Sequence, residues 1–153
     1  MKNDLEVKQA LYQQCVSSID ARLEVVQKAL NEIKEALLSE TKSSAGDKHE
    51  TGRAMLQLER EKTGNQLAET LKIKEALSKV DISKTSETVR LGSVVFTSKA
   101  NYFVAVSAGE LIFEGEKFYA ISPSTPIGQL LISKCIDDEI SFVNQTFKIE
   151  KII

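Results

Sequence analysis

The sequence predicts an α+β protein: an N-terminal antiparallel α-helical coiled-coil hairpin followed by a small antiparallel β-sheet domain with one short helix. One observation is composition. Up to Asp81 there is no proline and a single aromatic residue, Tyr12, whereas all six phenylalanines, both remaining tyrosines and both prolines follow Thr88. The other is periodicity, because apolar residues recur with a helical period in the first half and alternate in the second. We therefore expect two domains rather than one mixed core.

The first helix is predicted from a heptad pattern. From Tyr12 onward the apolar positions alternate spacings of four and three residues, which is typical of a seam buried against a partner helix. Charged residues such as Lys28 and Glu32 fall on other faces and suit solvent. The positions assigned to the seam are Leu5, Tyr12, Val16, Ile19, Leu23, Val26, Leu30, Ile33 and Leu37.

A reversal and a second helix follow the seam. The segment 39–48, SETKSSAGDK, has the composition of a loop. A second helix is predicted from about Lys48 to Val80, although Gly52 and Gly64 weaken it. A short loop between two long helices favours an antiparallel hairpin. The apolar positions of the second helix include Met55, Leu56, Leu67, Leu71, Leu77 and Val80.

The predicted domains are a helical hairpin over residues 1–81, a polar linker over 82–88 and a C-terminal domain over 89–153. In the C-terminal domain, a short helix is expected within 125–134, where Pro126 falls in the first turn and loses no hydrogen bond. Val-, Ile-, Phe- and Tyr-rich segments predict the strands. These segments are 89–98, 101–113, 116–122, 138–143 and 146–153.

Charge and cysteine content exclude several functions. The chain has 153 residues and a formal charge of −2, from 20 basic and 22 acidic side chains, so it lacks the basic excess of direct nucleic-acid binders. Cys15 and Cys135 form no CxxC pair, which argues against a zinc site and indicates two reduced, mostly buried thiols. No secretory signal and no membrane-spanning run is visible, so we expect a soluble cytoplasmic protein.

Conventional catalytic motifs are missing from the sequence. His49 is the single histidine, and there is no GxSxG, HExxH, P-loop or GxGxxG pattern. We therefore do not expect an enzyme in its own right. His49 is interpreted as an exposed bystander.

Two carboxylates at the predicted reversal are the candidate site. Asp47 and Glu50 are three residues apart, a spacing that places both on one face of a helix. Together they suit a hard divalent cation such as Mg²⁺, provided that another protein supplies further ligands. The alternative is structural, because Asp-x-x-Glu at a helix start also matches a capping box, in which each residue bonds the other's backbone N–H. Spacing alone leaves both interpretations open.

The sequence resembles the Gre family of bacterial transcript-cleavage factors. The segment GDKHE, residues 46–50, is similar to the family's Gly-Asp-x-x-Glu element between its two helices. The segment 120–140, AISPSTPIGQLLISKCIDDEI, resembles the family's Ser-Pro-Ile-Gly and Leu-Leu-x-Lys pattern, and VRLGSVVF resembles its Val-x-Leu-Gly-Ser-x-Val strand. The order and spacing agree across nearly the whole chain.

The resemblance implies an FKBP-like C-terminal domain that docks on bacterial RNA polymerase at the secondary channel, through a loop that includes Pro126, Ile127 and Gly128. It implies that Asp47 and Glu50 help to hold a Mg²⁺ shared with the polymerase active site, and so stimulate cleavage of backtracked transcripts. The factor would have no cofactor of its own, and we expect a monomer that acts on nascent RNA only indirectly.

Departures from the family pattern keep other functions open. Thr51-Gly52-Arg53-Ala54 stands where the family has Asn-Ala-Glu-Tyr, with a base in place of an acid. The first alternative is a secondary-channel regulator that inhibits or modulates the polymerase without cleavage. The others are a peptidyl-prolyl isomerase, which needs an aromatic-lined pocket, and a purely structural coiled-coil adaptor, which predicts homo-oligomers.

Overall fold

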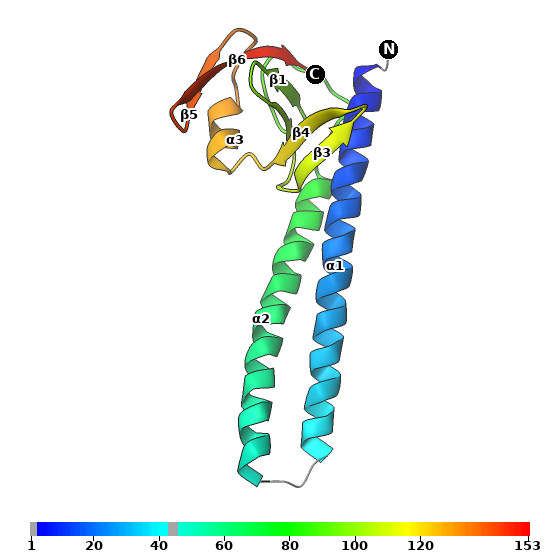
Figure 1. Cartoon of the computed structure of the whole chain (residues 1–153). Coiled ribbons are helices and arrows are strands. Elements are labelled where there is room, and N and C mark those ends of the chain that lie inside the picture. The colour runs from blue at the N-terminus through cyan, green and yellow to red at the C-terminus, as the bar shows by residue number, and fades with distance from the viewer. Residues whose placement is uncertain (1–2, 43–45) are drawn as a thin grey trace. The chain divides into compact units, whose positions relative to one another are not determined.

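The computed structural model describes residues 3–42 and 46–153, and for residues 41, 42 and 46–49 it describes the backbone alone. Helices α1 (Asp4–Lys42) and α2 (Gly46–Ser78) come first, and a sheet with one short helix follows (Figure 1). The predicted α+β class is confirmed. The boundary between the helices differs from the prediction, because helix extends through much of the segment 39–48 that was expected to be a loop.

The chain forms two compact units, and both long helices contribute to each of them. One unit contains residues 1–18 and 75–153, and the other contains residues 19–74. The domain limits predicted at residues 81 and 88 stay predictions. The first unit thus combines the sheet with the start of α1 and the last residues of α2.

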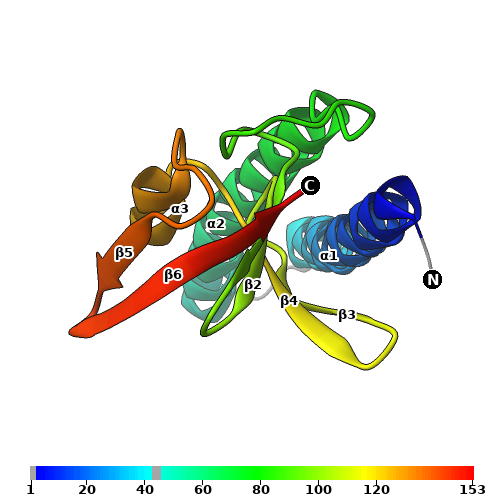
Figure 2. The ribbon, with the colours of Figure 1, turned by 90° about the horizontal axis from the view of Figure 1, so that it is seen from above.

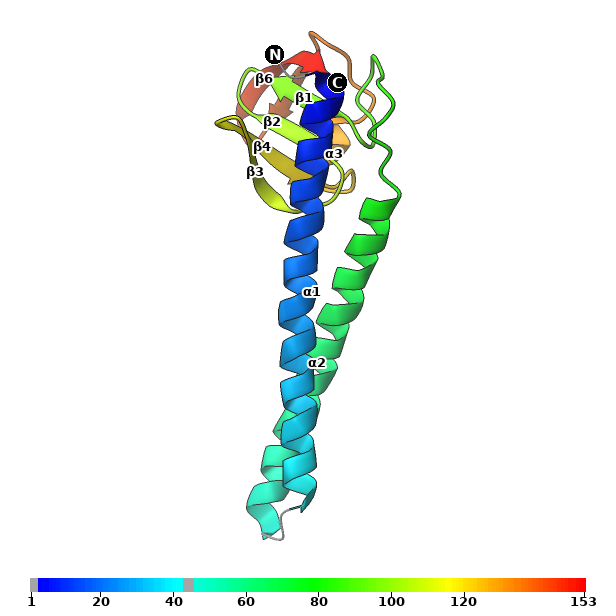
Figure 3. The same cartoon turned by 90° about the vertical axis from the view of Figure 1, so that its right-hand side faces the viewer.

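The unit of residues 19–74 is an antiparallel helix pair, as Figures 1 and 3 show. Close to the limits of this unit at residues 19 and 74, Lys74 Nζ lies 2.9 Å from the Asp20 carboxylate. Further along, a Cβ atom built on Gly52 would lie 3.4 Å from Glu40 Oε1. In both pairs the two residue numbers add up to nearly the same total, so the helices run antiparallel with a constant register.

The predicted seam is correct within this helix pair and changes before it. Ile19, Leu23 and Leu37 are buried, but Leu5 is 44% exposed, and fully buried Leu11 and Cys15 had not been assigned to the seam. The start of α1 belongs to the sheet unit, so it buries a different stripe. The second helix ends at Ser78 rather than at the predicted Val80. Among the apolar positions predicted for it, Leu77 is buried, and so is Val80 beyond the helix end, whereas Met55 and Leu71 are exposed.

Three side chains of α1 bond backbone groups elsewhere in the sheet unit. Tyr12 Oη donates to the Leu77 carbonyl at 3.1 Å, and Gln14 bonds the backbone of Ile112. Lys8, which is 1% exposed, donates to the carbonyl of Lys84 at 3.0 Å. Burial lowers the pKa of Lys8, although nearby acidic side chains oppose this effect.

The sheet of the described residues has six strands in the order β3-β4-β2-β1-β6-β5 (Figure 2). Most neighbouring pairs are antiparallel, as predicted, but β4 lies between β3 and β2 and pairs with β2 in parallel. The single strand predicted over 101–113 is two strands, β2 and β3. The bounds are β1 Val94–Thr97, β2 Asn101–Val104, β3 Gly109–Phe113, β4 Glu116–Ile121, β5 Glu139–Phe142 and β6 Gln145–Ile152.

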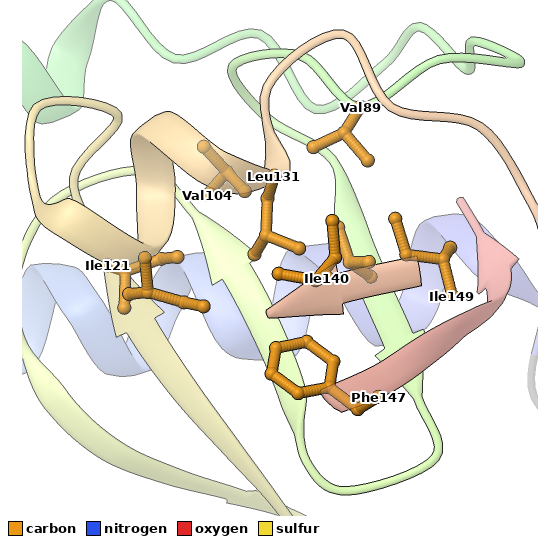
Figure 4. Close-up of a cluster of buried hydrophobic side chains, with 9 residues drawn as sticks. Val89, Val104, Ile121, Leu131, Ile140, Phe147 and Ile149 are labelled. Carbon is orange, nitrogen blue, oxygen red and sulfur yellow. The ribbon is translucent and has the colours of Figure 1, made fainter. Parts of the chain in front are cut away.

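The short helix α3 (Pro126–Leu131) begins as the sequence predicts. Thr125 is its N-cap and accepts a hydrogen bond from the N–H of Gly128 at 3.1 Å, while Pro126 occupies the first turn. Ile127 and Leu131 are buried in an apolar cluster with residues of the sheet and with Val89, which precedes β1 (Figure 4). The other members of this cluster are Val89, Val95, Val104, Ile121, Ile140, Phe147 and Ile149.

Two glycine substitutions are expected to change stability in opposite directions. A Cβ at Gly64 meets no atom within 4 Å, so Gly64→Ala removes only the helix penalty of glycine and stabilises the protein by about 1 kcal/mol. A Cβ at Gly128 would lie 2.2 Å from the carbonyl oxygen of Ser122, so Gly128→Ala destabilises by about 1–3 kcal/mol. Thermal unfolding measures both, and a stable Gly128→Ala variant would contradict the packing described for α3.

Candidate functional site

The two candidate carboxylates both lie at the start of α2. Asp47 and Glu50 are the second and fifth residues of this helix, and their spacing puts them on one side of it. Glu50 is exposed, whereas the side chain of Asp47 lies outside the described residues, as does that of His49. The metal-binding role of the pair and the bystander role of His49 therefore stay predictions.

The helix start bears on the capping-box alternative. An N-cap residue precedes the helix and has non-helical dihedral angles, but α2 begins at Gly46, one residue before Asp47. A reciprocal capping box is instead present at α1. There, the N–H of Glu6 donates to Asn3 Oδ1 at 2.8 Å, and the N–H of Asn3 donates to the Glu6 carboxylate at 3.3 Å. The capping role of Asp47, like its metal-binding role, stays a prediction.

The surroundings of Glu50 include both signs of charge. The carboxylate of Glu40 on α1 faces Gly52 across the helix pair. Arg53 follows Glu50 by three residues, so it lies on the same side of α2, and both Glu40 and Arg53 are partly buried and have interaction partners. A positive charge on this side of the helix opposes the field of the carboxylates and weakens their attraction for a cation.

The predicted docking residues occupy different environments. Pro126 is exposed, whereas Ile127 is 8% exposed and belongs to the apolar cluster, and Gly128 is buried against the carbonyl of Ser122. Packing alone accounts for the identity of Ile127 and Gly128. The docking role of this segment stays a prediction, and Pro126 is the member of the three with an accessible surface.

Exposed apolar residues close to α3 were not singled out from the sequence. Leu130 on α3 is 37% exposed and Ile136, in the loop that follows, is 48% exposed. The helical period offered a signal for Leu130, because two consecutive leucines in a six-residue helix cannot both face the core.

Among the open grooves on the described part of the chain are three that no aromatic side chain lines. One of them, of about 630 Å³, is bordered by residues that include Asp4, Glu87 and Cys135. The others, of about 470 and 370 Å³, are bordered by aliphatic, polar and charged side chains. These grooves do not provide the aromatic-lined pocket that a proline isomerase needs. Within the described residues, no three metal-binding side chains cluster.

Comparisons with known proteins give weak likenesses, all to solved structures. No protein-family model and no curated protein matches the chain. Among solved structures, that of the transcription factor Gfh1 is similar at 20% sequence identity and a TM-score of 0.35, over 94% of this chain and 93% of that chain. A likeness of this strength establishes neither a family nor a function.

The two cysteines differ in exposure. Both cysteines are free, and Cys15 is buried as expected, but Cys135 is exposed, which corrects the expectation of two mostly buried thiols. Cys135 precedes a tight turn in which its N–H donates to the Asp138 carboxylate at 2.7 Å.

Among the described helices, none has the length and apolar character needed to span a bilayer.

The two thiols should react at very different rates. Burial raises the pKa of the Cys15 thiol to about 11, so at pH 8 only about one molecule in a thousand carries the reactive thiolate there. In the native protein at pH 8, a disulfide reagent such as DTNB should label Cys135 quickly and Cys15 slowly. Labelling of the Cys135→Ser and Cys15→Ser variants separates the two sites. Equally fast labelling in both variants would contradict the burial of Cys15.

Proposed function

We propose that the chain binds bacterial RNA polymerase at its secondary channel and stimulates cleavage of backtracked transcripts. The observation that carries the proposal is the position of the segment Gly46-Asp47-x-x-Glu50. It forms the start of the second helix of an antiparallel pair, at the end where the chain reverses. The sequence resemblance to Gre factors predicts both the two carboxylates and the helix pair that carries them.

The helix pair suits a function that delivers side chains to a distant site. From Ile19 to Lys42, α1 has 24 residues, which span about 36 Å at about 1.5 Å per residue. Its apolar contacts are made within the chain, through residues such as Leu23 and Leu37, so it needs no second chain to cover its seam. These features support a monomer, and we further propose that it acts in the cytoplasm, where it meets the polymerase.

The chemistry of Asp47 and Glu50 at the start of α2 suits a cation whose ligands come from two proteins. Carboxylate oxygens are the ligands that Mg²⁺ prefers, but two carboxylates bind it weakly without further ligands. In this proposal Asp47 and Glu50 contribute oxygen ligands, and the polymerase contributes the others. When bound, the shared Mg²⁺ activates water and stabilises negative charge in phosphodiester hydrolysis. The chain is therefore not an enzyme by itself and carries no cofactor of its own.

A second candidate function retains docking and omits cleavage. Arg53 favours it, because its positive charge lies on the same side of α2 as Glu50 and competes with a cation for that carboxylate. In this alternative the hairpin inhibits or modulates the polymerase from the secondary channel. Nucleotide addition becomes slower, and no short 3′-terminal cleavage product appears.

The test of the proposed function uses backtracked complexes of the cognate polymerase with RNA labelled at its 3′ end. The wild-type chain should increase the rate of 3′-end release well above that with buffer. Asp47→Ala and Glu50→Ala should each reduce that increase at least about tenfold, because each removes a cation ligand. Glu61→Ala is the matched control, since it removes an exposed acid from the same helix away from its start.

The possible outcomes separate the two candidate functions. Cleavage with the wild-type chain that is unaffected by Asp47→Ala and Glu50→Ala would contradict the carboxylate mechanism. Slower nucleotide addition without cleavage would favour the inhibitory candidate, and Arg53→Ala should then weaken inhibition or restore cleavage. No effect of the wild-type chain on either reaction would contradict both.

A further inference from the structure

The groove of about 630 Å³ lies where four separate segments of the sheet unit meet. The first turn of α1 and the end of β6 form part of its border, and Lys151 Nζ on β6 lies 3.8 Å from Asp4 Oδ1 in that turn (Figure 3). The volume is in the range of ligand-binding sites. The bordering residues are Asp4, Thr85, Ser86, Glu87, Cys135, Ile136, Ile152 and Ile153.

Both charged side chains at the border of this groove are acidic. Glu87 is exposed and forms no ion pair within the part of the chain that the structure describes. Asp4 is partly compensated, because exposed Lys151 lies 3.8 Å away and buried Lys8 is within electrostatic reach. The groove therefore attracts a cation, and Glu87 contributes more to that attraction than Asp4 does.

The groove also offers aliphatic surface. Ile153 is 3% exposed and Ile152 is partly buried, whereas Ile136 is 48% exposed. Lysine and arginine side chains pack their aliphatic stems along apolar surface while their charged ends remain in polar surroundings. Among the described residues, no three metal-binding side chains cluster, so an organic cation suits this border better than a metal ion.

Backbone groups at the border are available for hydrogen bonding. Within the described residues, neither Thr85 nor Ser86 forms a backbone–backbone hydrogen bond. The chain's own pairing begins further on, where the Val89 N–H donates to the Lys134 carbonyl at 2.9 Å. An extended polypeptide can bond open backbone groups of this kind, as it does when it adds to the edge of a sheet. A small free amine cannot form such a series of bonds.

We propose that this groove binds an extended segment of a partner polypeptide that carries a lysine or arginine next to an aliphatic residue. The stem of the basic side chain lies on Ile136 and its charged end meets Glu87, with Asp4 as a second, weaker acid. The backbone of the bound segment bonds Thr85 and Ser86. This site is separate from the carboxylates at the start of α2, so it goes beyond the proposed function and does not depend on it.

The test titrates the isotope-labelled full-length chain with the peptide Ac-Lys-Val-Lys-Val-Lys-NH2 and follows backbone amide signals by NMR. Signals of Thr85, Ser86 and Ile136 should shift and saturate. The matched peptide Ac-Glu-Val-Glu-Val-Glu-NH2 should bind at least about tenfold more weakly, because its charges have the same sign as the border.

The exposed thiol of Cys135 gives a second readout at the same groove. In the Cys15→Ser variant, uncharged iodoacetamide should alkylate Cys135 at least about threefold more slowly when the lysine peptide is saturating, because the bound segment covers the thiol. The glutamate peptide at the same concentration should leave the rate unchanged.

Variants of the acids separate the groove from charge elsewhere. Glu87→Gln should weaken binding of the lysine peptide about threefold to fivefold, and Asp4→Asn should weaken it less, because Lys151 and Lys8 already oppose Asp4. Glu114→Gln is the matched control, since it removes an exposed acid from the turn between β3 and β4 and should leave the affinity unchanged.

Four results would overturn the proposal. They are no binding of the lysine peptide, equal affinity for the two peptides, unchanged affinity in Glu87→Gln, and equally tight binding of spermidine with the same signal shifts. The last result would make the groove a site for small cations rather than for a polypeptide. None of these measurements involves RNA polymerase, so their failure leaves the proposed function to its own test.

Discussion

The outer edge of β3 is bonded to a side chain rather than to another strand, and this contact joins α1 to the sheet within one unit. Gln14 Nε2 donates to the Ile112 carbonyl at 2.7 Å, and the Ile112 N–H donates to Gln14 Oε1 at 3.0 Å. The carboxamide thus replaces the peptide group of a neighbouring strand and satisfies edge groups that would otherwise be open to another chain. Together with Lys8 and Tyr12, it makes the first half of α1 part of the sheet unit.

The division of α1 between the two units explains which parts of its buried stripe could be predicted. From Ile19 to Leu37, α1 pairs with another helix, and a heptad pattern describes such a pairing well. Up to Ser18 the same helix belongs to the sheet unit, and the residues that it buries there are Leu11 and Cys15. No local pattern distinguishes these two environments, because both are helical. The parallel pairing of β2 and β4 was likewise unpredictable, since it depends on where a later strand enters the sheet.

Local chemistry made the candidate site partly predictable. Proline after threonine correctly placed the start of α3, but composition did not reveal that Gly128 lies against the Ser122 carbonyl. At the reversal, the Gly-Asp-x-x-Glu motif singled out Asp47 and Glu50, while the Ser- and Gly-rich segment before it predicted a longer loop than the structure has. Loop propensity is a local preference, and helix pairing overrides it there.

In the proposed function, the start of α2, with Asp47 and Glu50, reaches the metal site of RNA polymerase. The most direct measurement replaces the Mg²⁺ of the polymerase active site with Fe²⁺, which generates hydroxyl radicals that cut nearby protein backbone. With the end-labelled chain bound, the account predicts cuts confined to the residues around Asp47 and Glu50, whether the factor stimulates cleavage or inhibits the polymerase. Cuts confined to the sheet unit, or no cuts above those with free Fe²⁺, would contradict it.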